Sequence, residues 1–298
     1  MTDDRALPAA FTQTLSGPHR LRIEHATGFA YQGEVGASYN EARMLPSSTE
    51  TQFVLSSQLD IDPSTSVNYY TDYFGTRVAA FDVLAAHTDL SITARSLVEV
   101  RPRPLAYFAY GWERLALESA QSIATVEMRG QSHRTAPPAE VADLARTIAA
   151  QHDEPARAAL AIAAAVRDAV EYMPGTTGVH STAADAWGQH KGVCQDITHI
   201  TLGALREVGI PARYVSGYLH PSAHPEVGVA VTGESHAWVE WFAGEWQGFD
   251  PTNRIEIGER HVLVGRGRDY NDVPPLRGVY AGPFKSELHV QVTITREA

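Results

Sequence analysis

The sequence contains a single cysteine, Cys194, placed directly before a segment with helical periodicity. Apolar residues recur at three- and four-residue steps from Ile197 to Val208, which predicts one buried face of a helix that begins near the cysteine. A thiol in the first turn lies at the positive end of the helix dipole, beside unpaired backbone N–H groups that stabilise a thiolate and can bind an oxyanion. This position favours a reactive thiol, and the simpler alternative is a small side chain buried in the core.

Two further residues could complete a thiol-based site. A thiol nucleophile needs a base within hydrogen-bond reach and a third group that orients the base. His236 opens the segment HAWVEW and Asp250 ends the segment EWQGFD, with a short turn around Gly244 between them. A hairpin centred on Gly244 places residue 238 opposite residue 250. The side chains of His236 and Asp250 then share one sheet face as diagonal neighbours, about 7–8 Å apart at the backbone. Cys194, His236 and Asp250 together form the chemical set for acyl transfer.

Several nearby residues are candidates for supporting roles. Tyr172 and Gln195 are candidate donors to an oxyanion, and Trp187 is a candidate for contact with substrate, although each is more simply a packing or surface residue. Trp238 is another candidate for substrate contact. It faces the side of its strand opposite to Trp241, so at most one of the two can line the site.

A polar loop follows the segments that carry His236 and Asp250. It contains Asp269 and Tyr270, which could fold over a cleft and contact substrate; the alternative is a plain surface connection. His220 and His224 have the i, i+4 spacing of some metal sites, but Pro221 disfavours a helix there and no acidic or thiol partner lies beside them. We therefore expect no metal site and no cofactor.

The elements that must position these residues indicate an α+β protein. Strand-like segments from residue 18 to 101 predict an N-terminal antiparallel β-sandwich-like domain, followed by an irregular connector over 102–136. Residues 137–298 begin with two Ala-rich helical segments and continue as strands, which predicts a core whose helices and strands are segregated. The alternating segment 288–294 reads as a half-buried strand, and we assign it to this core.

Composition excludes several classes of protein. A formal charge of −11 with no cluster of Lys and Arg argues against nucleic-acid binding, and no segment approaches the roughly 18 apolar residues of a membrane span. The first residues, MTDDRALPAAFTQ, carry acids where an export signal carries positive charge, and one cysteine forms no internal disulfide. We therefore expect a cytoplasmic protein that binds neither nucleic acid nor membrane.

Three segments resemble the motifs of the transglutaminase-like superfamily, which has a papain-like core: GVCQDITHITLGALREVGIPARYVSGYL, SHAWVEWF and GFDPTN. The segments IEHATGFAY, SYNEARMLP and YFGTRV resemble the N-terminal domain found in many bacterial members. The resemblance implies that Cys194 is the nucleophile, His236 the general base and acid, and Asp250 the residue that orients the imidazole. It implies a peptide or protein substrate, with cleavage of peptide amide bonds as the first expectation. Protein cross-linking and a non-catalytic peptide-binding module are the alternatives.

Overall fold

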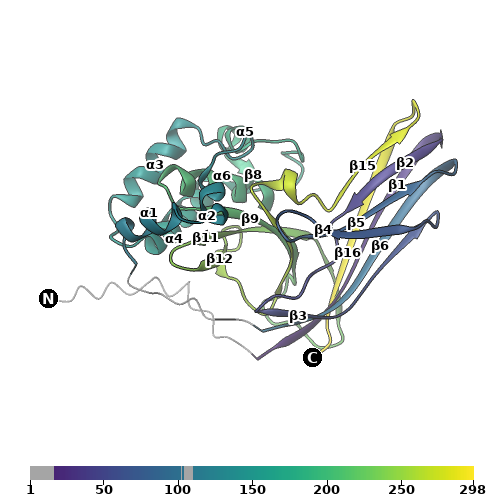
Figure 1. Ribbon diagram of the computed structural model, residues 1–298, viewed down its shortest axis with the longest axis horizontal. Coiled ribbons are helices and arrows are strands. Elements are labelled where there is room, and N and C mark those ends of the chain that lie inside the picture. The colour runs from purple at the N-terminus through teal and green to yellow at the C-terminus, as the bar shows by residue number, and fades with distance from the viewer. Residues whose placement is uncertain (1–16, 102, 104–109) are drawn as a thin grey trace.

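The computed structural model of the protein describes residues 17–101, 103 and 110–298. The prediction that no export signal is present concerns residues 1–13, which lie outside this range. The α+β class is confirmed: helices gather at one end of the molecule, and antiparallel sheets form the rest (Figure 1). Within the described ranges, no helix is long and apolar enough to cross a membrane.

The helices surround α6 (Cys194–Glu207), nearly all of whose residues are buried. The two Ala-rich helices are confirmed as α3 (Ala139–Ala149) and α4 (Pro155–Ala169). Both pack on α6, and their small alanine side chains allow close approach. The remaining helical elements are α5 (Ala183–Gln189), α1 (Trp112–Ser119), α2 (Ile123–Val126), and the 3-10 turns η2 (Glu127–Arg129) and η3 (Tyr270–Asp272).

The connector predicted to be irregular contains helix α1 and the short elements α2 and η2. Its Pro and Ser residues suggested a loop, but Leu115 of α1 is buried in the core formed by the other helices. Burial of one apolar face stabilises a two-turn helix that would be marginal in isolation. The connector therefore belongs to the helical layer in this part of the chain.

The central sheet carries the predicted hairpin. Its strand order is β13-β12-β11-β9-β14, with β13 (Ile255–Glu256), β12 (Trp246–Asp250), β11 (Ser235–Phe242), β9 (Ala212–Leu219) and β14 (His261–Gly267). Val239 lies opposite Phe249, which is the register of a hairpin centred on Gly244, so this prediction is confirmed. Alternate β11 residues, including Val239 and Trp241, face the helices and form a common core with them.

Two further sheets form the β domain. One has the order β10-β16-β1-β6-β3 and the other the order β15-β2-β5-β4. Their strands are β1 (His19–Val35), β2 (Ala37–Ala42), β3 (Gln52–Asp62), β4 (Val67–Thr71), β5 (Arg77–Val83), β6 (His87–Val100), β10 (Ala230–Gly233), β15 (Leu276–Ala281) and β16 (Ser286–Arg296).

The C-terminal strands correct the predicted domain boundary. The alternating segment 288–294 is a strand, as expected, but β16 pairs with β1 along its length and β15 pairs with β2. Figure 1 shows the yellow C-terminal strands beside the purple N-terminal ones. The alternation of residues 288–294 predicts a half-buried strand but does not specify its partner. Because β16 pairs with β1, the assignment of this segment to the core was wrong.

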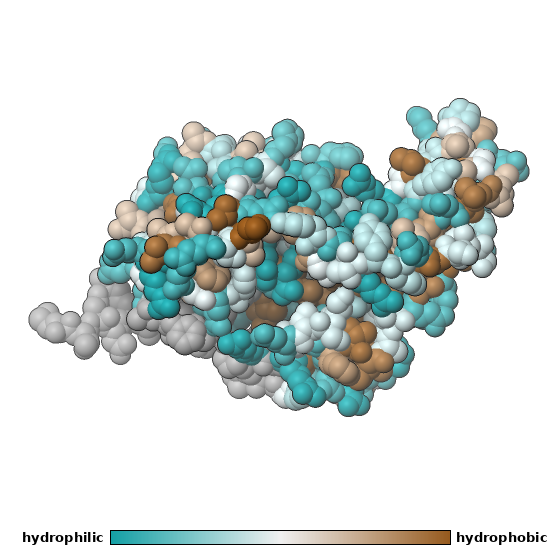
Figure 2. All heavy atoms as spheres, viewed as in Figure 1, coloured by the Kyte–Doolittle hydropathy of each residue, from teal (hydrophilic) through white to brown (hydrophobic). Residues whose placement is uncertain are grey.

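One face of the sheet β10-β16-β1-β6-β3 joins the β domain to the core. On β1, Leu21 and Ile23 pack with Val262 and Val264 of the central sheet, whereas Tyr31 packs between the two sheets of the β domain. All three β1 residues have the same parity and therefore share one side of the strand. A single continuous surface thus covers both the four-stranded sheet β15-β2-β5-β4 and the central sheet. On the outer face shown in Figure 2, hydrophobic groups are interspersed among hydrophilic residues.

A buried polar chain crosses the same junction. The Tyr218 hydroxyl on β9 donates to the carbonyl of Met44 at 2.9 Å, and its oxygen lies 3.0 Å from Nδ1 of His25 on β1. Thr27 Oγ1 lies 3.0 Å from Nε2 of the same ring. Burial of this ring disfavours its charged form and lowers the pKa of His25 from 6.5 to about 4.

The pKa of His25 predicts a weakening of the junction in acid. The unfolded chain takes up a proton near pH 6.5 and the folded chain only near pH 4, so this contribution to stability is present above pH 6.5 and is lost as pH falls toward 4. The free energy of unfolding of wild type relative to His25→Gln should therefore fall by about 2 kcal/mol between pH 7 and 4.5. Urea unfolding at the two pH values measures this, and a difference that stays constant would contradict it.

Candidate active site

Cys194 is the first residue of α6, as predicted, and its side chain is only partly buried. The Asp196 carboxylate holds this helix end, because Oδ2 accepts hydrogen bonds from the Val193 N–H at 2.8 Å and from the Thr177 hydroxyl at 2.6 Å. A Cβ atom at residue 192 would lie 2.7 Å from Cβ of Asp196, so this close approach requires Gly192. The cap places the sulfur at the positive end of the helix dipole.

His236 links the sulfur to a buried carboxylate. Its Nε2 atom lies 2.7 Å from Oδ2 of Asp250, and its pKa is raised by Asp250 and also by the side chain of Cys194. Since Nε2 is engaged by Asp250, Nδ1 is the nitrogen available to exchange a proton with the sulfur. The diagonal pairing expected from the hairpin thus brings His236 and Asp250 into direct contact.

The electrostatics of this pair follow from its burial. Burial lowers the pKa of His236, but the charge of Asp250 and its hydrogen bond, followed by the interaction with Cys194, outweigh burial and raise this pKa to about 10. Burial raises the pKa of Asp250, and the two histidines His236 and His261 outweigh that effect and hold it well below its usual range. At neutral pH the arrangement therefore favours an imidazolium beside a carboxylate.

Two residues that the sequence analysis did not identify complete the surroundings of Asp250. Asn253 donates from its backbone N–H to Oδ1 at 3.1 Å and from its side-chain amide to Oδ2 at 2.8 Å. His261 accepts a hydrogen bond from the Gly258 N–H at Nδ1, which assigns the proton to Nε2, and Nε2 lies 3.5 Å from Asp250. The motif GFDPTN could have indicated Asn253, whereas no local pattern marks His261.

Tyr172 lies opposite a residue that is two positions before Cys194. It belongs to β7 (Glu171–Tyr172), which pairs in parallel with β8 (Lys191–Gly192), so Tyr172 is opposite Gly192. Burial and then the negative charges of Cys194, Glu234 and Asp250 raise its pKa to about 12. The phenol therefore keeps its proton at neutral pH and remains a hydrogen-bond donor near Cys194.

Other residues singled out in the sequence direct their side chains to partners other than Cys194. The Gln195 amide points toward the carbonyl of Val179 at 3.5 Å, and the Trp187 indole donates to Glu140 at 2.9 Å within the helical core. Trp238 is buried on the face of β11 opposite to Trp241 and packs edge-on against His261.

The loop predicted as a possible cover for the cleft packs against α6. Asp269 is buried and accepts a hydrogen bond from the Asn271 N–H at 2.7 Å. The backbone N–H of Tyr270 donates to His199 at 3.2 Å, and the Tyr270 ring lies edge-on to Tyr214. Asp269 and Tyr270 therefore take part in packing against α6, which differs both from a cover over the cleft and from the plain surface connection given as its alternative.

A cleft of about 580 Å³ opens beside His236. Its lining residues come from the helical part of the chain, from the central sheet with its loops, and from β10. They are Arg167, Tyr172, Leu219, Pro221, Thr232, Gly233, Glu234, His236, Thr252, Asn253, Ile255 and Arg260. This volume is in the range of ordinary ligand sites. In the part of the chain that the structure describes, no group of three or more His, Cys, Asp or Glu side chains is placed to hold a metal ion.

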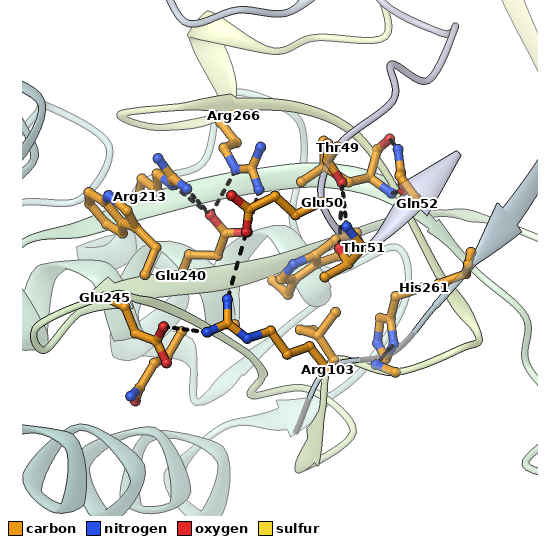
Figure 3. Close-up of a pocket in the computed structure, with 18 residues that line it drawn as sticks. Thr49, Glu50, Thr51, Gln52, Arg103, Arg213, Glu240, Glu245, His261 and Arg266 are labelled. Carbon is orange, nitrogen blue, oxygen red and sulfur yellow. Dashed lines mark hydrogen bonds and ion pairs between the residues drawn. The ribbon is translucent and has the colours of Figure 1, made fainter. Parts of the chain in front are cut away.

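A second cavity, of about 640 Å³, lies on the face of the central sheet that points away from the helices, the same face of β11 that carries His236 (Figure 3). Glu240 accepts hydrogen bonds there from Arg213 at 2.6 Å and from Arg266 at 2.8 Å, and these two guanidinium groups overcome burial to lower its pKa to about 2. The three side chains join β11, β9 and β14. Glu240 is four residues from His236, so this cluster braces the strand that carries the imidazole.

Comparisons with known proteins identify the family of both regions of the chain. The family model for the transglutaminase-like superfamily matches residues 142–251, and that for the bacterial transglutaminase-like N-terminal region matches residues 21–99. The chain is 44% identical to an uncharacterised protein of Mycobacterium leprae, over 94% of this chain and 99% of that one. It is 31% identical to a protein-glutamine gamma-glutamyltransferase of Pseudomonas aeruginosa, over 39% of this chain and 19% of that protein.

A solved structure shares the fold over nearly the whole chain. It belongs to a candidate cysteine protease from Cytophaga hutchinsonii and superposes with a TM-score of 0.73 at 21% identity, covering 93% of this chain and 91% of that one. The papain-like architecture expected for the core is therefore confirmed.

Replacement of Asp250 tests the electrostatic description of the site. In Asp250→Asn, the pKa of His236 should drop by about 2 or more, because the largest influence that favours the imidazolium is lost while burial remains. NMR titration of the His236 ring in the two proteins measures this. Asp168→Asn, which removes an exposed carboxylate paired with Arg254, is the matched control and should leave the titration unchanged. A His236 ring that titrates alike with and without Asp250 would contradict the description.

Proposed function

The chain belongs to the transglutaminase-like superfamily, and from this membership we propose that it is a thiol hydrolase that cleaves amide bonds in peptides. Cys194 acts as nucleophile, His236 as general acid and base, and Asp250 as the group that orients the imidazole. The observation that carries this proposal is the 2.7 Å contact of His236 with a fully buried carboxylate, on an imidazole that also interacts electrostatically with the lone cysteine at the start of α6. A purely structural histidine does not require this combination.

Acylation follows from the positions of these groups. The Cys194 thiolate attacks the carbonyl carbon of the substrate, and a C–S bond forms. The C–N bond then breaks as the His236 imidazolium transfers its proton to the leaving amine. The thioester that remains on Cys194 is resolved by water: His236 takes a proton from the water, a C–O bond forms, and the C–S bond breaks to restore the thiolate and release an acid.

The oxyanion formed in each step needs hydrogen-bond donors. The backbone N–H of Cys194 is one, because an N–H in the first turn has no partner within the helix. Tyr172 is our choice for the second, since its phenol remains protonated beside the sulfur. Gln195 is the weaker candidate because its amide points toward Val179.

Protein cross-linking is the second candidate function. A primary amine would replace water in the second step and form a new amide from the same thioester. The similarity to the Pseudomonas aeruginosa gamma-glutamyltransferase over 129 residues favours this alternative. The chemistry up to the thioester is common to both, so the two functions differ only in the acceptor. A module that binds peptide without chemistry is the third candidate.

Turnover assays separate the three candidates. A cell-derived peptide mixture should release amines with wild type and none with Cys194→Ala, and trapping with a fluorescent amine should label few acceptors if water is the preferred nucleophile. Efficient incorporation of the amine into glutamine-containing peptides would instead identify a transferase. Equal results for wild type and Cys194→Ala in both assays would contradict the proposal and leave the binding module.

A second experiment addresses the oxyanion donor. Tyr172→Phe should lower kcat by roughly 10²-fold with little change in KM, because the lost hydrogen bond forms mainly in the transition state. Gln195→Ala should change kcat by less than about threefold. Steady-state kinetics on a peptide found in the first assay gives both values. If Gln195→Ala has the larger effect, the assignment of Tyr172 is wrong.

A further inference from the structure

We propose that Glu234 selects substrates that carry a positive charge, such as a lysine or arginine side chain or a free amino group, near the acyl group that is attacked. This inference rests on the proposed function, because it names the class of substrate that the same cleft accepts. The charged side chains that line the cleft differ in how many hydrogen bonds they make within the protein.

The two arginines that line the cleft support its walls. Arg167 donates from Nε to the carbonyl of Thr252 and from Nη1 to the carbonyl of Val170, each at 2.8 Å. Arg260 donates from Nη1 to the carbonyls of His220 and Ser222 at 3.2 and 3.1 Å, and its side chain is largely buried. These donor groups are therefore engaged by the backbone that shapes the cleft.

Glu234 lines the same cleft and is exposed. Across residues 17–101, 103 and 110–298, its carboxylate makes no hydrogen bond or ion pair, while its charge acts on the Tyr172 phenol together with that of Cys194. It is also two residues before His236. A carboxylate without an ion pair among the described residues thus lines the cleft that His236 also lines, where it attracts a cation and repels an anion.

The backbone at Glu234 is fixed on both sides. The preceding residue, Gly233 on β10, pairs with Val292 on β16 in the β domain. The following residue, Ser235, pairs with Tyr218 in the central sheet. A Cβ atom at Gly233 would lie 2.9 Å from Ile294, so the two strands are in close contact there. The carboxylate therefore projects from the junction of two sheets, and the β domain contributes directly to the cleft.

Tyr172 provides a second element for recognition of a cation. Its ring is partly exposed in the cleft that Glu234 also lines. An aromatic ring face attracts ammonium and guanidinium groups, and a carboxylate nearby adds a charge-assisted hydrogen bond. The pair is suited to a basic group on the substrate and disfavours an acidic one.

Because Cys194 is the only cysteine in the sequence, the rates at which charged thiol reagents label the protein report the electrostatic potential at its sulfur. This measurement does not require a known substrate. Methanethiosulfonates with an ammonium group or a sulfonate group form a mixed disulfide with the thiolate and release methanesulfinate. The ratio of the cationic to the anionic rate constant should fall about three- to tenfold in Glu234→Gln, since one negative charge is removed from the cleft. The matched control is Glu287→Gln, an exposed glutamate near the start of β16, and it should leave the ratio unchanged.

The peptide arm of the test uses substrates that differ only in having Lys, Gln or Glu beside the scissile amide. Wild type should prefer Lys, and Glu234→Gln should reduce that preference mainly through KM. A labelling ratio that is the same in wild type and Glu234→Gln would overturn the inference while leaving the proposed function intact. Failure of every reagent to reach Cys194 in the folded protein would overturn both.

Discussion

The buried carboxylate of Asp250 constrains the whole site. Its side chain is shielded from water, and a charge in that position is tolerated only when hydrogen bonds and opposite charge compensate its lost hydration. His236 supplies the charge, and Asn253 and His261 supply further donors. Because these groups come from separate elements, the ionised carboxylate can be buried only when the fold brings all of them together. The same requirement keeps the imidazole turned toward the sulfur.

Both sheet systems contribute to that arrangement. The hairpin of β11 and β12 sets the distance between His236 and Asp250, and β14 brings His261 from the far edge of the sheet. The β domain covers this sheet through one continuous face, and the chain returns to it at both β10 and β16. The N-terminal region is therefore part of the framework of the cleft, since removal of its sheet would also remove the partner of the strand that precedes Glu234.

Local patterns predicted the parts of the site that depend on local structure. Helical periodicity placed the start of α6 at Cys194, and the parity of a hairpin about Gly244 placed His236 against Asp250. Both depend on short-range geometry, which a sequence expresses directly. The partner of β16 depends on long-range pairing, and its alternation fits any half-buried sheet position, which explains the wrong domain boundary. His261 was missed for the same reason, because it meets Asp250 only through the order of strands.

The central claim is that Cys194, His236 and Asp250 act as one unit, and reactivity of the sulfur in paired variants tests it most directly. The measurement is the rate constant for alkylation of Cys194 by iodoacetamide at pH 6 in wild type, His236→Gln, Asp250→Asn and the double variant. If Asp250 acts through the imidazole, each single variant reacts much more slowly than wild type and the double variant reacts no more slowly than His236→Gln. Losses that multiply in the double variant, or a wild-type rate no faster than that of the variants, would contradict the account.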